Sequence, residues 1–135
     1  MKKLIVAART DQLERVLDFL TEELAAAGCP LKTQTQVMVA AEEIFVNIAK
    51  YAYAGAGGGV AIVLDISGDP PLLKLEFRDS GQPYNPLSRE DPDVSLSAED
   101  REIGGLGVYM VKKTMDSVAY AYRDGENILT VSKRF

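Results

Sequence analysis

The sequence predicts an α+β two-layer sandwich, in which a mixed β-sheet of about five strands carries helices on one face. Two observations support this fold class. The hydrophobic patterns follow the order β-α-α-β-β-loop-α-β-β, which lacks the strict βαβ alternation of a parallel sheet and has no internal repeat. The 135 residues are 47% hydrophobic and 26% charged, an ordinary composition for a single globular domain, which we expect to span residues 1–135.

The N-terminal part of the chain predicts one strand followed by one helix. Residues 2–8 alternate as a strand with one apolar face. Asp11 followed by Glu14 is typical of a helix N-terminus that the aspartate side chain caps. Leucine and valine then recur at helical spacing, and Gly28 with Pro30 should end this helix.

The rest of the chain predicts two more helices and two hairpins. An apolar stripe indicates a second helix over residues 33–54, and a third should run from 104 to about 115. Prolines at the first turn and Asp124-Gly125 at the second are typical of chain reversals between strands. The expected strands of the two hairpins are 60–66 with 72–78, and 118–123 with 128–135.

The composition excludes several classes of chemistry. The sequence has no histidine, so it cannot supply a Ser-His-Asp or Cys-His nucleophile, a His-ligated zinc site or a histidine that autophosphorylates. Its single Cys29 excludes an internal disulfide and a multi-cysteine metal site, which suits a reducing compartment. A net charge of −5 argues against direct nucleic-acid binding, and no apolar run has the length of a membrane span. We therefore expect a soluble cytoplasmic protein with no membrane partner.

Three polar clusters could carry chemistry, and the first lies on the second expected helix. Glu43, Asn47 and Tyr51 are spaced four residues apart, so they share one face of that helix. Asparagine is a poor helix former in the middle of a helix, and this suggests a compensating role. Taken alone, the pattern is more often a solvated polar face.

The second cluster follows the third expected strand. Asp79 ends the apolar run of that strand, and Gly81 comes two residues later. This arrangement can bring a carboxylate and bare backbone up to a planar ligand, although many ordinary turns have the same sequence. A long aperiodic segment, residues 79–103, begins here, and loops of this length inside a compact domain are usually functional or mobile.

The third cluster is the glycine-rich turn that opens the third expected helix. Gly104, Gly105 and Gly107 would admit close backbone approach, and free amides at a helix N-terminus favour phosphate. The turn is neither a Walker A motif, because it lacks the Lys-Ser/Thr ending, nor a Rossmann fingerprint, because no βαβ unit surrounds it. By itself such a turn is most often structural.

The order of the three clusters is more specific than any one of them. Glu-x-x-x-Asn on a helix, Asp-x-Gly after a strand, a long loop and Gly-Gly-Leu-Gly before a helix together resemble the Bergerat-type, histidine-kinase-like ATP-binding fold. The closest resemblance is to the anti-sigma regulatory factors that are serine-protein kinases. It covers nearly the whole chain, although Tyr51 stands where many members carry histidine. The matching motifs lie at 43–53, 79–86, 104–116 and 124–130.

The resemblance implies that the chain binds ATP, with the base held by the second and fourth motifs. Asp79 would accept a hydrogen bond from the adenine amino group, and Gly81 would let the base approach the backbone. Thr130 would touch the adenine edge through water, although a threonine in a strand is more often only a β-former.

On the phosphate side, the resemblance implies a magnesium ion and a general base. Asn47 would bind Mg²⁺ through its side-chain oxygen, and Glu43 would take the proton of the attacking hydroxyl. Backbone amides of Gly104, Gly105 and Gly107 would contact the phosphates.

Two functions follow from the resemblance. One is a serine-protein kinase that phosphorylates a serine of an anti-anti-sigma antagonist protein in a partner-switching system. The other is a non-catalytic module that uses nucleotide to shape a surface for a regulatory partner. Whether a sigma factor also binds, and whether the chain forms a homodimer, stays open. An ATP lid is expected at about residues 86–103, where six acids against two arginines fit a solvated face or a weakened affinity for ATP.

Overall fold

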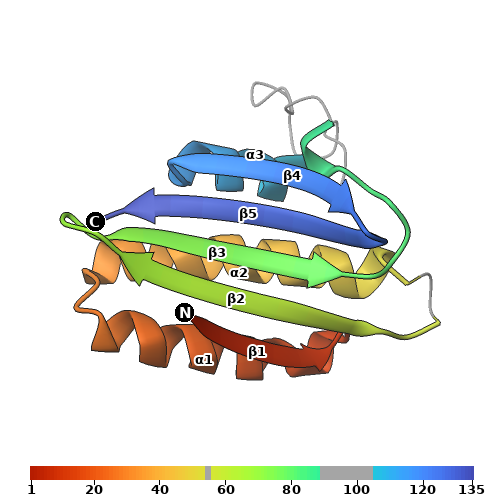
Figure 1. Ribbon diagram of the computed structural model, residues 1–135, viewed down its shortest axis with the longest axis horizontal. Coiled ribbons are helices and arrows are strands. Elements are labelled where there is room, and N and C mark those ends of the chain that lie inside the picture. The colour runs from red at the N-terminus through yellow and green to blue at the C-terminus, as the bar shows by residue number, and fades with distance from the viewer. Residues whose placement is uncertain (54–55, 89–104) are drawn as a thin grey trace.

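The computed structural model describes residues 1–53, 56–88 and 105–135, which form two layers (Figure 1). In this part of the chain, five strands make one sheet and three helices cover one of its faces. Short 3₁₀ turns lie at Thr10–Gln12 and Pro86–Ser88. The main elements are β1 (Lys2–Ala7), α1 (Leu13–Ala26), α2 (Leu31–Tyr51), β2 (Gly59–Ser67), β3 (Leu72–Asp79), α3 (Gly105–Thr114), β4 (Ser117–Arg123) and β5 (Glu126–Arg134). The predicted one-sided α+β sandwich is confirmed.

The described sheet is antiparallel throughout, which corrects the mixed sheet that the sequence predicts. The strand order is β1-β2-β3-β5-β4, and every neighbouring pair runs antiparallel. The chain leaves β3, passes through α3 and forms β4 at the edge of the sheet, and β5 then folds back between β4 and β3 (Figure 1). If β4 itself had paired with β3, that pair would have been parallel. The insertion of β5 removes the parallel pair.

The core lies between the helices and the inner face of the sheet. Side chains of a strand point alternately to its two faces, and in β3 Leu73, Leu75 and Phe77 are fully buried under the helices. Phe45 of α2 is also fully buried in this cluster. Each such side chain stabilises the fold by about 1.5–3 kcal/mol through its burial. Asp79 continues the alternation of β3, so its carboxylate lies on the helix side of the sheet.

Two expected helix starts are corrected by the structure. Asp11 does not cap α1, because its carboxylate accepts hydrogen bonds from Arg9 (3.1 Å) and Gln12 (3.3 Å). The segment 10–12 is a 3₁₀ turn, and α1 begins only at Leu13. The second helix begins earlier than residue 33, at Leu31, since Pro30 has the extended backbone of an N-cap residue. None of the described helices combines the length and apolar character needed to cross a bilayer.

Candidate functional site

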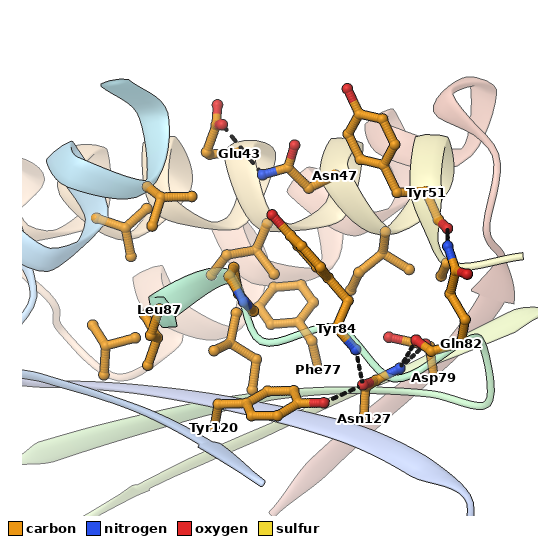
Figure 2. A pocket seen from close by; sticks show the side chains of 18 residues that line it. Glu43, Asn47, Tyr51, Phe77, Asp79, Gln82, Tyr84, Leu87, Tyr120 and Asn127 are labelled. Atoms are coloured by element: carbon orange, nitrogen blue, oxygen red, sulfur yellow. Dashed lines mark hydrogen bonds between the residues drawn. The ribbon is translucent and has the colours of Figure 1, made fainter. Parts of the chain in front are cut away.

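A pocket lies between α2 and the inner face of the sheet (Figure 2). It is lined by residues of α2, β3, α3, β4 and β5 and of the segment that follows β3, and part of it is open to solvent. Its walls are mainly apolar, with polar side chains gathered at two places. Glu43 and Asn47 of α2 line one place, and Asp79 and Asn127 at the ends of two strands line the other.

The Asp79 carboxylate is held in place by hydrogen bonds to one of its oxygens. Oδ1 accepts the backbone N–H of Gly81 at 2.9 Å and the side-chain amide of Asn127 at 3.0 Å. The residue is only 5% exposed, yet its carboxylate lines the pocket (Figure 2). Because neither of these bonds uses Oδ2, that oxygen remains an acceptor for a donor that enters the pocket. The carboxylate that the sequence predicts at a strand end is therefore accessible to a ligand in the pocket.

The segment after Asp79 is attached to the C-terminal end of α2. The backbone N–H of Gln82 donates to the carbonyl of Ala52 at 2.8 Å, and the Gln82 side chain donates to the carbonyl of Tyr51 at 3.0 Å. The hydroxyl of Tyr53 accepts the backbone N–H of Ser80 at 2.8 Å. These bonds fix the sheet end of the pocket relative to the helix that carries its other polar residues.

Glu43, Asn47 and Tyr51 of α2 all line the pocket, as their four-residue spacing predicts. The side-chain amide of Asn47 donates to Oε1 of Glu43 at 3.3 Å, and this bond orients the amide (Figure 2). Asn47 Oδ1 is then free to accept or to ligate. Tyr51 is 54% exposed and lies at the pocket edge near the end of α2. All three side chains border one cavity, and a polar helix face that is merely solvated does not require this.

The glycine-rich turn is only partly described. The helix α3 begins at Gly105 and includes Gly107, and Val108 and Val111 of the same helix line the pocket. Gly104 lies outside the described residues. The expected lid, residues 86–103, is described only from 86 to 88, where a 3₁₀ turn carries Leu87 to the pocket.

The structure does not bring Thr130 to the pocket. Thr130 pairs with Glu76 of β3 and Ala119 of β4, on the face of the sheet that points away from the helices. Its neighbour Leu129 points the other way and lines the pocket. The expected contact between Thr130 and a base is thus incompatible with this register, because successive side chains of a strand face opposite sides.

Three pocket residues were not singled out as site residues in the sequence. Asn127 is the second residue of β5 and pairs directly with Asp79, and its buried amide makes several hydrogen bonds. Tyr120 of β4 donates its hydroxyl to the Asn127 side-chain oxygen. Tyr84 crosses the pocket with its ring (Figure 2). The available signal was Asn127 itself, since asparagine is depleted in strands and needs a compensating role there.

A pocket between a helix layer and one face of an antiparallel sheet defines an α+β sandwich domain with a candidate small-molecule site between its layers. The sequence profile of the histidine kinase-like ATPase domain matches residues 6–133 of this chain. The chain therefore belongs to the histidine kinase-like ATPase domain family, and the resemblance stated from the sequence motifs is confirmed.

Curated relatives are similar over most of this chain. The serine/threonine-protein kinase BtrW of Bordetella bronchiseptica is 30% identical over 92 residues, which are 68% of this chain and 64% of BtrW. The serine-protein kinase RsbW of Listeria monocytogenes is 26% identical over 107 residues, 76% of this chain and 68% of RsbW. The match thus spans about two-thirds of the length of these relatives.

A solved structure has the same fold. The crystal structure of the RsbU and RsbW domains of Rv1364c from Mycobacterium tuberculosis matches 99% of this chain and 32% of that chain, with a TM-score of 0.65. The sequence identity is 19%, so the likeness concerns the fold alone.

Proposed function

We propose that this chain is an ATP-dependent serine-protein kinase that phosphorylates a serine of an anti-anti-sigma type antagonist protein. One observation carries the proposal: a single pocket has a buried carboxylate acceptor, Asp79, at its sheet end and the Glu43–Asn47 pair on its helix wall. Base recognition and phosphoryl transfer need these two kinds of group in one cavity. The names of the relatives BtrW and RsbW, both protein kinases, support the same assignment.

At the sheet end, the Asp79 carboxylate accepts a hydrogen bond from the exocyclic amine of adenine. Its Oδ1 is occupied by Gly81 and Asn127, and Oδ2 is the oxygen that meets the base. Phe77 and Leu129 give this part of the pocket apolar surface for the faces of a purine ring. Because Gly81 has no side chain, the base can approach the backbone closely at this position.

On the helix wall, Asn47 fits a magnesium ligand. Its amide nitrogen is turned toward Glu43, so its oxygen is the atom presented away from that bond (Figure 2). Mg²⁺ prefers oxygen ligands and is usually held by one or two protein groups together with phosphates and water. When bound, the ion neutralises charge on the transferred phosphoryl group.

Glu43 is the general base of the proposed transfer. Its Oε1 accepts the Asn47 amide, and Oε2 is the oxygen that accepts the proton of an incoming serine hydroxyl. The same bond holds the glutamate beside the proposed magnesium ligand, one helical turn away. Backbone amides at the N-terminal end of α3, with Gly104, Gly105 and Gly107, contact the phosphates in this proposal.

The experiment is a transfer assay with a separate binding measurement. The protein is titrated with ATP and Mg²⁺ in a calorimeter, and is then incubated with labelled ATP and each antagonist domain encoded in the source genome. Phosphoserine on one antagonist, absent with Glu43→Gln, is the expected result. ATP-dependent antagonist binding without phosphoserine would instead establish the binding-module function. Absence of any nucleotide binding would overturn the ATP site itself.

A further inference from the structure

Asn127 has every hydrogen-bonding position of its side chain occupied by other groups of the protein (Figure 2). Its nitrogen donates to Asp79 Oδ1 at 3.0 Å and to the carbonyl of Gln82 at 2.9 Å, with a longer contact to the carbonyl of Gly81 at 3.5 Å. Its oxygen accepts the backbone N–H of Tyr84 at 3.1 Å and the hydroxyl of Tyr120. A primary amide has two donor hydrogens and two acceptor lone pairs, so this side chain is saturated.

The orientation of the Asn127 amide is fixed by its backbone partners. The N–H of Tyr84 can only donate, and the carbonyl of Gln82 can only accept. A flipped amide would place donor against donor and acceptor against acceptor. The nitrogen must therefore face Asp79, and Tyr120 must donate its proton to the oxygen.

The sheet register makes this arrangement precise. Asp79 and Asn127 are directly paired residues of β3 and β5, on the face that carries the pocket. Tyr120 of β4 pairs with Leu129, two residues along β5, so it reaches Asn127 as a diagonal neighbour. Three adjacent strands thus contribute one side chain each to a single network, and Asn127 lies at its centre.

We propose that Asn127 is a positioning residue that sets the base preference of the pocket, an inference that rests on the proposed nucleotide site. By holding Oδ1 of Asp79, it fixes the carboxylate with Oδ2 directed to the ligand. By taking the proton of Tyr120, it leaves the phenol oxygen with acceptor capacity only. The pocket then offers acceptors to a purine, which favours an exocyclic amine and opposes a carbonyl at the same position.

Base preference distinguishes this role from simple support of the fold. The measured quantity is the ratio of Kd values for ATP and for the purine riboside triphosphate that lacks the 6-amino group. We expect the unaltered protein to prefer ATP by about tenfold or more, the usual effect of a hydrogen bond to a charged group. Asn127→Leu keeps the approximate size of the side chain but removes all of its hydrogen bonds, so the ratio should fall toward one.

A matched control comes from the same strand. Ile128 is 6% exposed and faces the opposite side of the sheet, so Ile128→Val removes a packed methyl group without contacting the network. It should lower the melting temperature and leave the ratio unchanged. If Asn127→Leu weakens both ligands equally, or leaves the ratio as in the unaltered protein, the positioning role is wrong. If the unaltered protein binds neither nucleotide, the proposed nucleotide site fails first.

Asn127→Asp provides a second readout that does not depend on the leucine variant folding. The introduced carboxylate meets Asp79 at hydrogen-bond distance, and two such groups share a proton only as the pH falls. The ratio of the two Kd values should be low at pH 8 and recover toward pH 5. The other titratable groups described in the pocket are present in the unaltered protein as well as in the variant, so the unaltered protein controls for their titration; they are Glu43, Tyr51, Tyr84 and Tyr120. Phosphate titration affects both ligands alike, so the ratio removes it. A ratio that does not change with pH in this variant would contradict the proposal.

Discussion

A Cβ atom on Gly81 would lie 2.1 Å from the carbonyl oxygen of Ala52, far inside any tolerated contact. Ala52 is the C-cap residue of α2, and the same oxygen accepts the backbone N–H of Gln82. The strand end that carries Asp79 and the helix that carries Asn47 are therefore joined by a backbone contact that only glycine permits. We expect the distance between Asp79 at the sheet end of the pocket and Asn47 on its helix wall to depend on this contact.

Gly81→Ala should consequently destabilise the protein and open the pocket. Forcing a methyl group into such a contact costs about 1–3 kcal/mol in a packed region, and the Gln82 bond should be lost with it. Denaturant unfolding measures the change. Gly59→Ala is the matched control, because a Cβ there would meet only an ordinary 3.6 Å contact with Val6. Equal stability of the two variants would refute the close approach of the backbones.

Much of the site could be predicted because its signals are local. Helical spacing placed Glu43 and Asn47 on one face, and strand alternation placed Asp79 at the end of a buried run. These inferences need only the period of a helix or a strand. The reason that position 81 is glycine could not be predicted in the same way, since it depends on a contact with Ala52, which lies on a different element.

The errors in the sheet concern β5, because its position depends on the pairing of all the other strands. The expected strand 128–135 began two residues too late, because Asn127 is a poor strand former that tertiary hydrogen bonds keep in the ladder. Because the expected strand excluded Asn127, the sequence did not indicate that this residue pairs with Asp79. The face on which Thr130 lies depends on which residue pairs with Asp79, and a motif resemblance does not specify that register.

Thr130→Val tests this register. Thr130 faces the side of the sheet opposite the pocket, so the substitution should leave the Kd for ATP unchanged within about twofold, and valine is a good strand former. Calorimetric titration with ATP measures the Kd, and a denaturant midpoint close to that of the parent shows that the fold is kept. A clear loss of ATP affinity would place the side chain at the base and contradict the strand register.

Asp79→Asn should weaken ATP binding without unfolding the protein. An asparagine oxygen can still accept the bonds from Gly81 and Asn127, and its amide nitrogen then replaces Oδ2 in the pocket. A donor would face the adenine amine where an acceptor is needed, which costs about 1.5–3 kcal/mol, or at least about tenfold in affinity. Calorimetric titration tests this, with the denaturant midpoint as control. Unchanged affinity would remove Asp79 from the base site.

Glu43→Gln and Asn47→Ala should separate proton transfer from metal binding. A glutamine oxygen can still accept the Asn47 amide, so the helix wall and ATP binding should be preserved. The amide cannot take a proton, and loss of a general base typically slows a reaction by about 10²–10⁴-fold. Asn47→Ala should lower both ATP affinity in Mg²⁺ and the transfer rate, because it removes the proposed ligand oxygen.

The two variants are compared by single-turnover transfer to the antagonist and by ATP titration with and without Mg²⁺. A steep loss of rate at constant Kd for Glu43→Gln, together with a Mg²⁺-dependent loss of affinity for Asn47→Ala, fits the proposed roles. If Glu43→Gln transfers phosphate as fast as the parent, the bond at 3.3 Å between the two side chains serves only to orient Asn47. Transfer would then depend on positioning and charge neutralisation, as it largely does in other phosphoryl-transfer enzymes.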